Sequence, residues 1–421
     1  MAKVDVLLGL QWGDEGKGKV VDYLAPKYDL VARFQGGPNA GHTLEFEGIK
    51  HVLHQIPSGI FHEGILNVIG NGVVIDPITF RREIEALDKF NLDLKSHLVL
   101  SNKAQLILPT HRLLDQAYES IKGDNKIGST LRGIGPTYQD KIGRLGLRIG
   151  DVLRPDFLIK YNALKTQHLE ILEKLGHGDV DANFDEPFHA AVDVLREFKI
   201  TSTEYLINEQ INSGKKVLAE GAQGSMLDID FGSYPFVTSS NTTTAGACTG
   251  LGISPRNIGE VFGIFKAYCT RVGSGPFPTE LLNPVGEDLR KRGHEFGATT
   301  GRPRRCGWLD LPALNYACML NGVTQLFMMK TDVLSGMEEI AICEKYSNTE
   351  SESMVPFYYS GDTIKAEFTK VSVWPQFENK KNFSDLPNEL IQFIKKVESF
   401  TNTPIGLISH GPDRKETIFR N

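Results

Sequence analysis

The chain has no long apolar run and no cysteine pattern that indicates disulfides or a metal site. A membrane-spanning helix needs about 20 consecutive apolar residues, and the sequence contains no such stretch. The five cysteines form no C-x-x-C pair and no cluster with histidine, which favours free thiols in a reducing compartment. The first residues enter a predicted strand directly, without the pattern of a signal peptide. We therefore expect a cytoplasmic protein that contacts no membrane.

An excess of positive charge is also missing. The formal net charge is −6 and the pI is near 6.0, which disfavours nonspecific nucleic-acid binding and confines any anion site to a local positive pocket. The 421 residues can bury a substantial core, with ordinary hydrophobic (40%) and charged (23%) fractions. Because the sequence shows no internal repeat, low-complexity segment or clear linker, we predict one domain, 1–421, with a helical insertion at about 156–213.

A glycine-rich loop lies between a predicted strand, 4–10, and a predicted helix that starts near Val20. Gly13 to Lys19 fits the G-x-x-x-x-G-K spacing of phosphate-binding loops, in which glycines let backbone N–H groups surround an anion and lysines neutralise it. Val20 replaces the Ser or Thr that usually holds Mg²⁺, so Asp14 is the candidate metal ligand. An ordinary glycine-rich turn is the alternative.

Further candidate loops follow predicted strands. The strand at 30–34 leads into a Gly/Asn-rich loop that ends at His42, a position that favours a chemical over a structural role for this histidine. The strand at 216–219 leads into 220–224, a junction of the kind that binds ligands at the carboxyl edge of a sheet.

Three other segments carry suitable side chains. Residues 127–138 are predicted to be an irregular loop that either approaches a phosphate or lies on the surface. Residues 298–308 hold three arginines within four positions, which suits forked recognition of carboxylate or phosphate, with a solvated charge cluster as the alternative. The predicted strand at 325–329 is followed by Lys330-Thr331-Asp332. This K-x-D spacing is similar to the guanine-reading motif of GTPases.

Leu8 to Val20, together with Arg33 to Thr43, closely resembles the adenylosuccinate synthetase family, and similar blocks recur along nearly the whole chain. The resemblance implies an α/β fold: a large, central, mostly parallel β-sheet flanked by helices, with a P-loop-like phosphate site and inserted helical and small β subdomains. It also implies GTP-dependent ligation of IMP and L-aspartate to adenylosuccinate, GDP and phosphate. The reaction passes through 6-phosphoryl-IMP and is the first committed step of AMP synthesis from IMP.

The resemblance also implies roles for individual residues. Asp14 would remove the N1 proton of IMP, His42 would act as general acid toward the transferring phosphoryl group, and Lys17 would neutralise charge. One Mg²⁺ per subunit would be bound by Asp14 and the carbonyl of Gly41. The implied IMP site comprises Asp14, Asn39, Ala40, Gly41, His42, Thr130, Arg144, Gln223, Thr238 and Arg302. The implied aspartate site comprises Ala298, Thr299, Thr300, Gly301, Arg302, Pro303 and Arg304. The implied GTP site comprises Gly13, Asp14, Glu15, Gly16, Lys17, Gly18, Lys19, Gly41, His42, Thr43, Arg304, Lys330, Thr331, Asp332, Ser409, His410 and Gly411.

Arg144 would reach the IMP site of a neighbouring subunit, which makes a homodimer necessary for activity. The sequence departs from the family pattern at Pro38, Leu131, Pro303 and His410. Two other functions remain open from the residues alone. A GTP-binding switch would hydrolyse GTP without other substrates, and a different phosphotransferase or ATP-dependent ligase would accept ATP in full.

Overall fold

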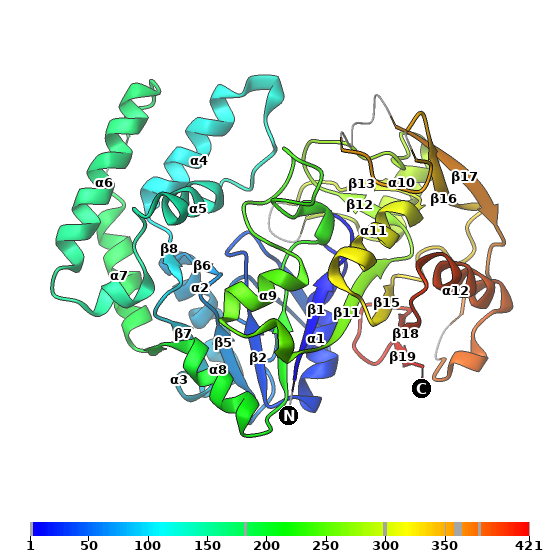
Figure 1. Ribbon diagram of the computed structural model, residues 1–421, viewed down its shortest axis with the longest axis horizontal. Coiled ribbons are helices and arrows are strands. Elements are labelled where there is room, and N and C mark those ends of the chain that lie inside the picture. The colour runs from blue at the N-terminus through cyan, green and yellow to red at the C-terminus, as the bar shows by residue number, and fades with distance from the viewer. Residues whose placement is uncertain are drawn as a thin grey trace.

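The computed structural model describes residues 3–180, 183–297, 301–349, 351–357, 364–377 and 380–420. A ten-stranded sheet runs through the molecule in the order β19-β18-β15-β11-β1-β10-β2-β5-β7-β9 (Figure 1). Its neighbours pair in parallel, except for β19, which is antiparallel to β18. The predicted large, mostly parallel α/β sheet is therefore confirmed.

The central strands are β1 Val4–Gly9, β2 Leu30–Arg33, β5 Leu66–Ile69, β7 Leu98–Ser101, β9 Lys199–Thr201, β10 Val217–Glu220, β11 Ile258–Lys266, β15 Gln325–Met329, β18 Ile405–Ser409 and β19 Thr417–Phe419. The remaining strands form small sheets: β3 His42–Phe46, β4 Ile49–Leu53, β6 Val74–Ile75, β8 Gln105–Leu106, β12 Cys269–Arg271, β13 Arg305–Gly307, β14 Leu309–Asp310, β16 Ile340–Ser347 and β17 Lys365–Val371. The α-helices are α1 Lys17–Leu24, α2 Pro77–Leu87, α3 Leu94–His97, α4 Pro109–Ile121, α5 Ile134–Gly143, α6 Phe157–Lys174, α7 Asp185–Arg196, α8 Thr203–Asn212, α9 Thr244–Leu251, α10 Pro284–Arg292, α11 Leu311–Asn321 and α12 Asn388–Thr401.

The centre of the sheet is β1, and its side chains alternate between two hydrophobic clusters. Val4, Val6 and Leu8 belong to one cluster, which also contains residues of α8, α9 and α11, whereas Leu7 packs with Val20 of α1 in another. Both faces are therefore covered, which explains why this strand is an apolar run rather than an alternating pattern.

Neighbours far apart in the sequence, β10 and β11, pair with β1 on its two sides. The order of the parallel strands thus changes direction at β1, and ligands of open α/β sheets bind at such a point, beyond the carboxyl ends of the strands. The loops after β1, β2, β10, β15 and β18 all leave this edge. These are the loops in which the sequence placed most of the candidate site residues.

Two local predictions differ from the structure. Helix α1 begins at Lys17, three residues before the predicted start, because Gly16 takes a left-handed N-cap conformation with φ 92°. The predicted irregular loop 127–138 ends early, since α5 begins at Ile134 after a left-handed Gly133. Pro136 falls in the first turn of that helix, where a missing N–H costs no helical hydrogen bond.

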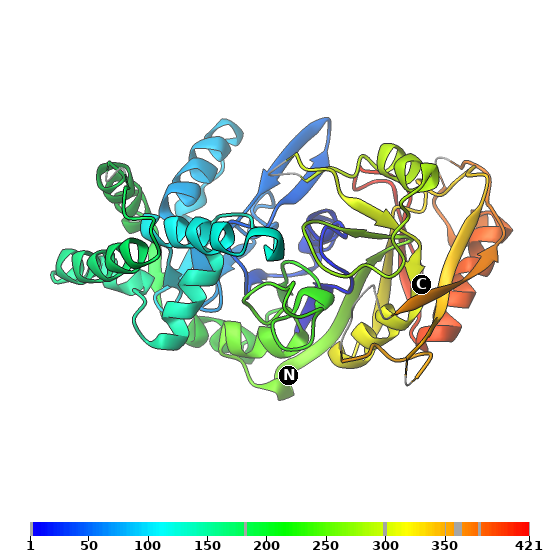
Figure 2. The ribbon, with the colours of Figure 1, turned by 90° about the horizontal axis from the view of Figure 1, so that it is seen from above.

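Residues 156–213 are largely helical, and they also contribute β9, which pairs with β7 at the edge of the central sheet. Figure 2 shows the helices of this region at one end of the molecule and the β16–β17 pair with α12 at the opposite end. Among the described residues, no helix is both long and apolar enough to cross a membrane.

Candidate active site

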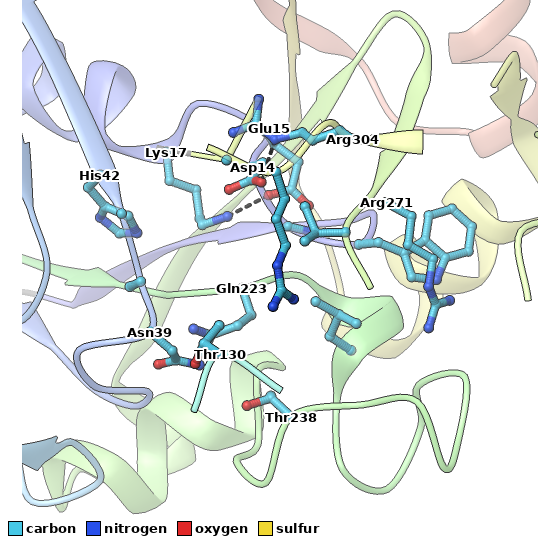
Figure 3. A pocket seen from close by; sticks show the side chains of 18 of the residues that line it. Asp14, Glu15, Lys17, Asn39, His42, Thr130, Gln223, Thr238, Arg271 and Arg304 are labelled. Carbon is cyan, nitrogen blue, oxygen red and sulfur yellow. Dashed lines mark hydrogen bonds and ion pairs between the residues drawn. The ribbon is translucent and has the colours of Figure 1, made fainter. Parts of the chain in front are cut away.

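A cavity of about 970 Å³ opens at the carboxyl edge of the sheet, at the upper end of the size range of ligand pockets. Most of the candidate residues line it, although they come from loops spread along the whole chain (Figure 3). The lining includes Gly13, Asp14, Glu15, Gly16, Lys17, Gly18, Lys19, Asn39, Ala40, Gly41, His42, Thr43, Thr130, Gln223, Thr238, Arg302, Arg304, Lys330, Asp332, Ser409 and Gly411.

The glycine-rich loop is built around the buried carboxylate of Glu15. This carboxylate accepts hydrogen bonds from the backbone N–H groups of Gln11 (3.1 Å) and Gly13 (2.9 Å) and from Nζ of Lys17 (2.5 Å). Gly18 lets α1 approach the strand that carries His42, because a Cβ at position 18 would lie 2.9 Å from the Cβ of His42. The loop therefore keeps its shape through an internal anion and places Lys17 and His42 at one wall of the cavity.

Asp14 sits in this loop with a left-handed backbone, φ 59°, a region that is uncommon for non-glycine residues and in which Asp is enriched. Its Oδ2 accepts a hydrogen bond of 2.7 Å from Nε of Arg304, and 34% of the side chain is exposed (Figure 3). The carboxylate is thus held at the cavity wall by an arginine 290 positions away.

His42 begins β3, and its Nδ1 lies 2.5 Å from Oε1 of Glu220, at the end of β10. Glu220 also accepts from the backbone N–H (2.8 Å) and the hydroxyl (2.6 Å) of Ser58. Burial, followed by the charge of Arg33, lowers the pKa of His42 to about 4, although Glu220 opposes this shift. His42 Nε2 has no hydrogen-bond partner among the described residues, which leaves this nitrogen for a ligand.

The predicted guanine reader lies at the end of β15. Oδ1 of Asp332 is buried and has no partner in the described part of the chain, and burial raises the pKa of this carboxyl. Lys330 donates from Nζ to the carbonyl of Gly293 (2.5 Å). Nζ of Lys19 donates to Oγ of Ser409 (2.7 Å) and to the carbonyl of Gly411 (2.7 Å), so Lys19 ties α1 to the loop after β18.

The loop that carries Thr130 is held by two carboxylates of α4. Glu119 accepts from the backbone N–H groups of Gly128 (2.8 Å) and Ser129 (3.0 Å). Asp115 accepts from the hydroxyl of Ser129 (2.8 Å) and from the N–H of Gly133 (2.9 Å). Thr130, Asn39, Gln223 and Thr238 come together on one side of the cavity (Figure 3).

Other candidates lie outside the cavity lining. Arg144 ends α5 on the exposed surface with φ 62°. Thr331 is buried and donates from its hydroxyl to the carbonyl of Ser409 (3.0 Å), and His410 is buried. Gly301 and Pro303 are exposed and do not line the described cavity. Ala298, Thr299 and Thr300 of the implied aspartate site lie outside the described residues.

A separate group with metal-ligand spacing, His111, Asp140 and His168, joins α4, α5 and α6. Nδ1 of His111 accepts from the N–H of Leu108 (2.8 Å), so its Nε2 carries the proton that it donates to Asp140 (2.9 Å). His168 Nε2 lies 2.9 Å from the same oxygen of Asp140. Because the Nε2 lone pair of His111 is used by its own proton, this group fastens three helices and does not form the metal site of the cavity.

Sequence reasoning gave no role to two buried glutamates, Glu220 and Glu295. Both are fully buried, and each contacts a residue with an expected role: Glu220 contacts His42, and Glu295 binds Arg304 (2.6 Å). A carboxylate at the end of an otherwise apolar strand, as in 217–220, is a usable signal for Glu220. No comparable local pattern marks Glu295.

Comparison with known proteins identifies the family. The family model described as adenylosuccinate synthetase matches residues 6–418. The chain is 59% identical to the adenylosuccinate synthetase of Cytophaga hutchinsonii over 99% of this chain and 98% of that protein. It is 56% identical to that of Porphyromonas gingivalis over 100% of both chains. The structure of the fully ligated adenylosuccinate synthetase from Plasmodium falciparum superposes with a TM-score of 0.92 at 37% identity, covering 100% of both chains.

A succinoaminodeoxyadenylate synthetase of cyanophage S-2L, 20% identical with a TM-score of 0.61, shares the fold. The family match covers nearly the full length of the chain, and the relatives named above with more than half of their residues identical carry the same family name. The chain belongs to the adenylosuccinate synthetase family, whose members ligate IMP and L-aspartate at the expense of GTP in AMP synthesis.

Proposed function

We propose that Asp14, His42 and Lys17 carry the chemistry of this ligation, with Asp14 as general base. The observation that supports this most is that all three side chains line one cavity. His42 starts β3, and the missing side chain of Gly18 lets α1 pack closely against it. The reaction joins IMP and aspartate through 6-phosphoryl-IMP, so the site must first activate an oxygen and then release phosphate.

The 6-oxygen of IMP is a poor nucleophile while N1 keeps its proton. A carboxylate within hydrogen-bond reach of N1 can take that proton as O6 attacks the γ-phosphorus of GTP and GDP leaves. The side chain of Asp14 is 34% exposed, whereas the carboxylate of Glu15 next to it is fully buried and accepts hydrogen bonds from two backbone N–H groups. This contrast supports Asp14 as the base and Glu15 as a structural anion. The amino group of aspartate then attacks C6 and phosphate departs.

His42 suits the role of proton donor to the transferring phosphoryl group. Since Nδ1 bonds Glu220, only Nε2 remains for a ligand. The low pKa of His42 keeps the ring neutral at pH 7 while no anion is bound, whereas a phosphate dianion next to Nε2 favours the protonated form. Lys17 and the N–H groups of the loop neutralise the phosphate oxygens, which is most of what phosphoryl transfer requires.

The residues present fit a magnesium ion. Mg²⁺ prefers oxygen ligands and is usually bound by one or two carboxylates together with substrate phosphates and water. Asp14 and Gly41 both line the cavity, and Arg304 contacts the Asp14 carboxylate through Oδ2. We propose that these two groups hold one ion per subunit, which when bound supplies charge neutralisation of the phosphates.

We also propose a homodimer in which Arg144 completes the IMP site of the partner. Arg144 is exposed, and two large apolar side chains beside it, Ile142 and Leu145, are 79% and 55% exposed. Arginine is enriched at protein–protein interfaces, and the centre of an interface is apolar, so exposed apolar side chains next to Arg144 support this proposal. A cytoplasmic location is supported by the free thiols of all five cysteines.

One coupled assay tests the proposed chemistry. Adenylosuccinate formation and phosphate release are followed while IMP, aspartate and GTP are omitted in turn, with the Asp14→Asn protein alongside. Activity that requires all three substrates and is lost in Asp14→Asn supports the proposal. Phosphate release from GTP alone would point to a switch protein, and full activity with ATP would point to a different ligase.

A further inference from the structure

A buried carboxylate behind the cavity, that of Glu295, joins four groups from three other segments of the chain. Its oxygens accept from the hydroxyl of Tyr268 (2.5 Å), from Nη1 of Arg304 (2.6 Å) and from Nζ of Lys266 (3.2 Å). Nζ of Lys330 lies 3.6 Å away. Glu295 is fully buried and is not among the residues that line the described cavity, so it has no direct access to a substrate.

The charges around this carboxylate explain why it stays ionised. Burial alone would raise its pKa, but the positive charges of Lys266, Lys330 and Arg304 lower the pKa of Glu295 to about 2. A buried ion that is paired and hydrogen-bonded in this way becomes costly when one partner is removed. Because Lys266, Arg304 and Lys330 share this one carboxylate, the position of each cation depends on the other two.

Backbone contacts add to the side-chain contacts. The N–H of Arg304 donates to the carbonyl of Glu295 (2.9 Å), and the N–H of Gly297 donates to the carbonyl of Arg302 (2.8 Å). Residues 295–297 and 302–304 thus pair as the stem of the segment that the family resemblance implies for aspartate binding. Glu295 stands at the base of this stem, where it holds Arg304 by both its main chain and its side chain.

Arg304 has a second partner on the other side. Its Nη1 binds Glu295, while its Nε binds Oδ2 of Asp14 at 2.7 Å. One guanidinium therefore spans the buried carboxylate and the proposed base. Because the guanidinium is planar and rigid, the orientation of its Nε toward Asp14 depends on Glu295, which binds its Nη1.

We propose that Glu295 is a positioning residue: it holds Arg304 against Asp14 and so links the stem of the aspartate segment to the proton-abstracting carboxylate. The inference rests on the role proposed above for Asp14 as general base and on the place of Arg304 in the implied aspartate site. Through Lys330, the same carboxylate also contacts the end of β15, which carries the guanine reader.

The test compares Glu295→Gln with a matched control, Glu280→Gln. Glu280 pairs with Arg305, the neighbour of Arg304 in the sequence, and neither residue lines the described cavity. Two quantities are measured in each dimeric protein with all substrates present or with aspartate omitted. The first is the pair of kinetic constants KM and kcat, determined separately with aspartate and with IMP as the varied substrate. The second is the IMP-dependent movement of an isotopic oxygen label from the β–γ bridge of GTP, which reports the first chemical step alone.

For Glu295→Gln we expect KM for aspartate to rise about tenfold or more and label movement to slow by a similar factor, with KM for IMP within about threefold of the parent. Glu280→Gln should leave all these quantities near the parent values. Glu295→Asp, which keeps the charge, should recover part of the loss. A folded Glu295→Gln protein that matches Glu280→Gln in both measurements would overturn the inference.

Folding is checked by circular dichroism and thermal unfolding. If Glu295→Gln does not fold, the same measurements are made on Tyr268→Phe. This substitution removes one hydrogen bond to Glu295 and keeps every charge. A smaller shift in the same two measurements supports the inference, and parent values overturn it. Loss of activity in Asp14→Asn with parent-like Glu295→Gln would refute only the positioning role, whereas an active Asp14→Asn would refute the proposed base itself.

Discussion

Replacing Asp332 by Asn should convert this enzyme from GTP to xanthosine triphosphate. Guanine presents two donors to the carboxylate, its N1–H and its 2-amino group, whereas xanthine keeps N1–H and presents a carbonyl at C2. Oδ1 of Asp332 is buried without a partner among the described residues, so a base is expected to supply that partner. The asparagine amide offers one acceptor and one donor, which matches xanthine and opposes guanine.

The magnitude follows from the two hydrogen bonds between this side chain and the base. A hydrogen bond to a charged group contributes about 1.5–3 kcal/mol, and the substitution weakens one such bond and turns the other into a donor facing a donor. We expect a loss of about 3–5 kcal/mol in transition-state stabilisation with GTP, or roughly 10²- to 10⁴-fold in kcat/KM. With xanthosine triphosphate most of this loss should be recovered, because both hydrogen bonds are restored.

The assay is initial-rate kinetics with each nucleotide at saturating IMP and aspartate, for the parent, Asp332→Asn and the exposed control Asp385→Asn. Stability should not fall, since burial raises the pKa of Asp332 and the folded chain therefore disfavours its charged form. Thermal unfolding checks this point. An Asp332→Asn protein that folds like the parent and still prefers GTP would refute the reasoning that this carboxylate reads guanine.

Four other outcomes are expected. Asp14→Asn should lower kcat by several orders of magnitude while nucleotide binding, measured by calorimetry, persists; near-normal turnover would exclude the base role. His42→Asn should lower kcat by about 10²-fold or more, and an unchanged pH–rate profile at lower amplitude would contradict proton donation. Arg144→Leu should regain part of its activity when mixed with inactive Asp14→Asn, because hybrid dimers hold one intact site; no recovery would contradict a shared site. Burial lowers the pKa of His111 from 6.5 to about 4, so the unfolded chain binds more protons below pH 6.5 and stability falls as the pH falls toward 4. Between pH 7 and 5 the parent should lose about 2 kcal/mol of unfolding free energy more than His111→Asn in denaturant titrations, and equal losses would contradict this.

The strand ends could be predicted because their signals are local. The largely apolar runs at 4–10, 217–219 and 325–329 lie mostly buried in the central sheet, and each is followed by polar or glycine-rich residues. In a parallel sheet the carboxyl ends of strands meet at one edge. In the structure, Asp14, Gln223 of the 220–224 loop and Asp332 all line the described cavity.

The start of α5 shows where local signals misled. Glycines at 133 and 135 and Pro136 indicated an irregular loop, yet Gly133 is a left-handed N-cap whose N–H is held by Asp115. The acceptor comes from α4, 18 positions earlier, and the helix depends on that tertiary contact. A composition rule applied to 127–138 alone contains no information about it.

What the sequence by itself determined is the set of loops and the side chains that they carry: the glycines of 13–18, a carboxylate at 14, a histidine at 42 and the triplet Lys330-Thr331-Asp332. What only the tertiary structure decided is which side chains pair. Arg304 reaches Asp14 across 290 positions and Glu220 reaches His42 across 178, while Lys19 turns to the loop after β18. Periodicity encodes burial and backbone direction over a few residues, whereas the partner of a buried charge depends on the order of strands in the sheet, which no short window of sequence contains.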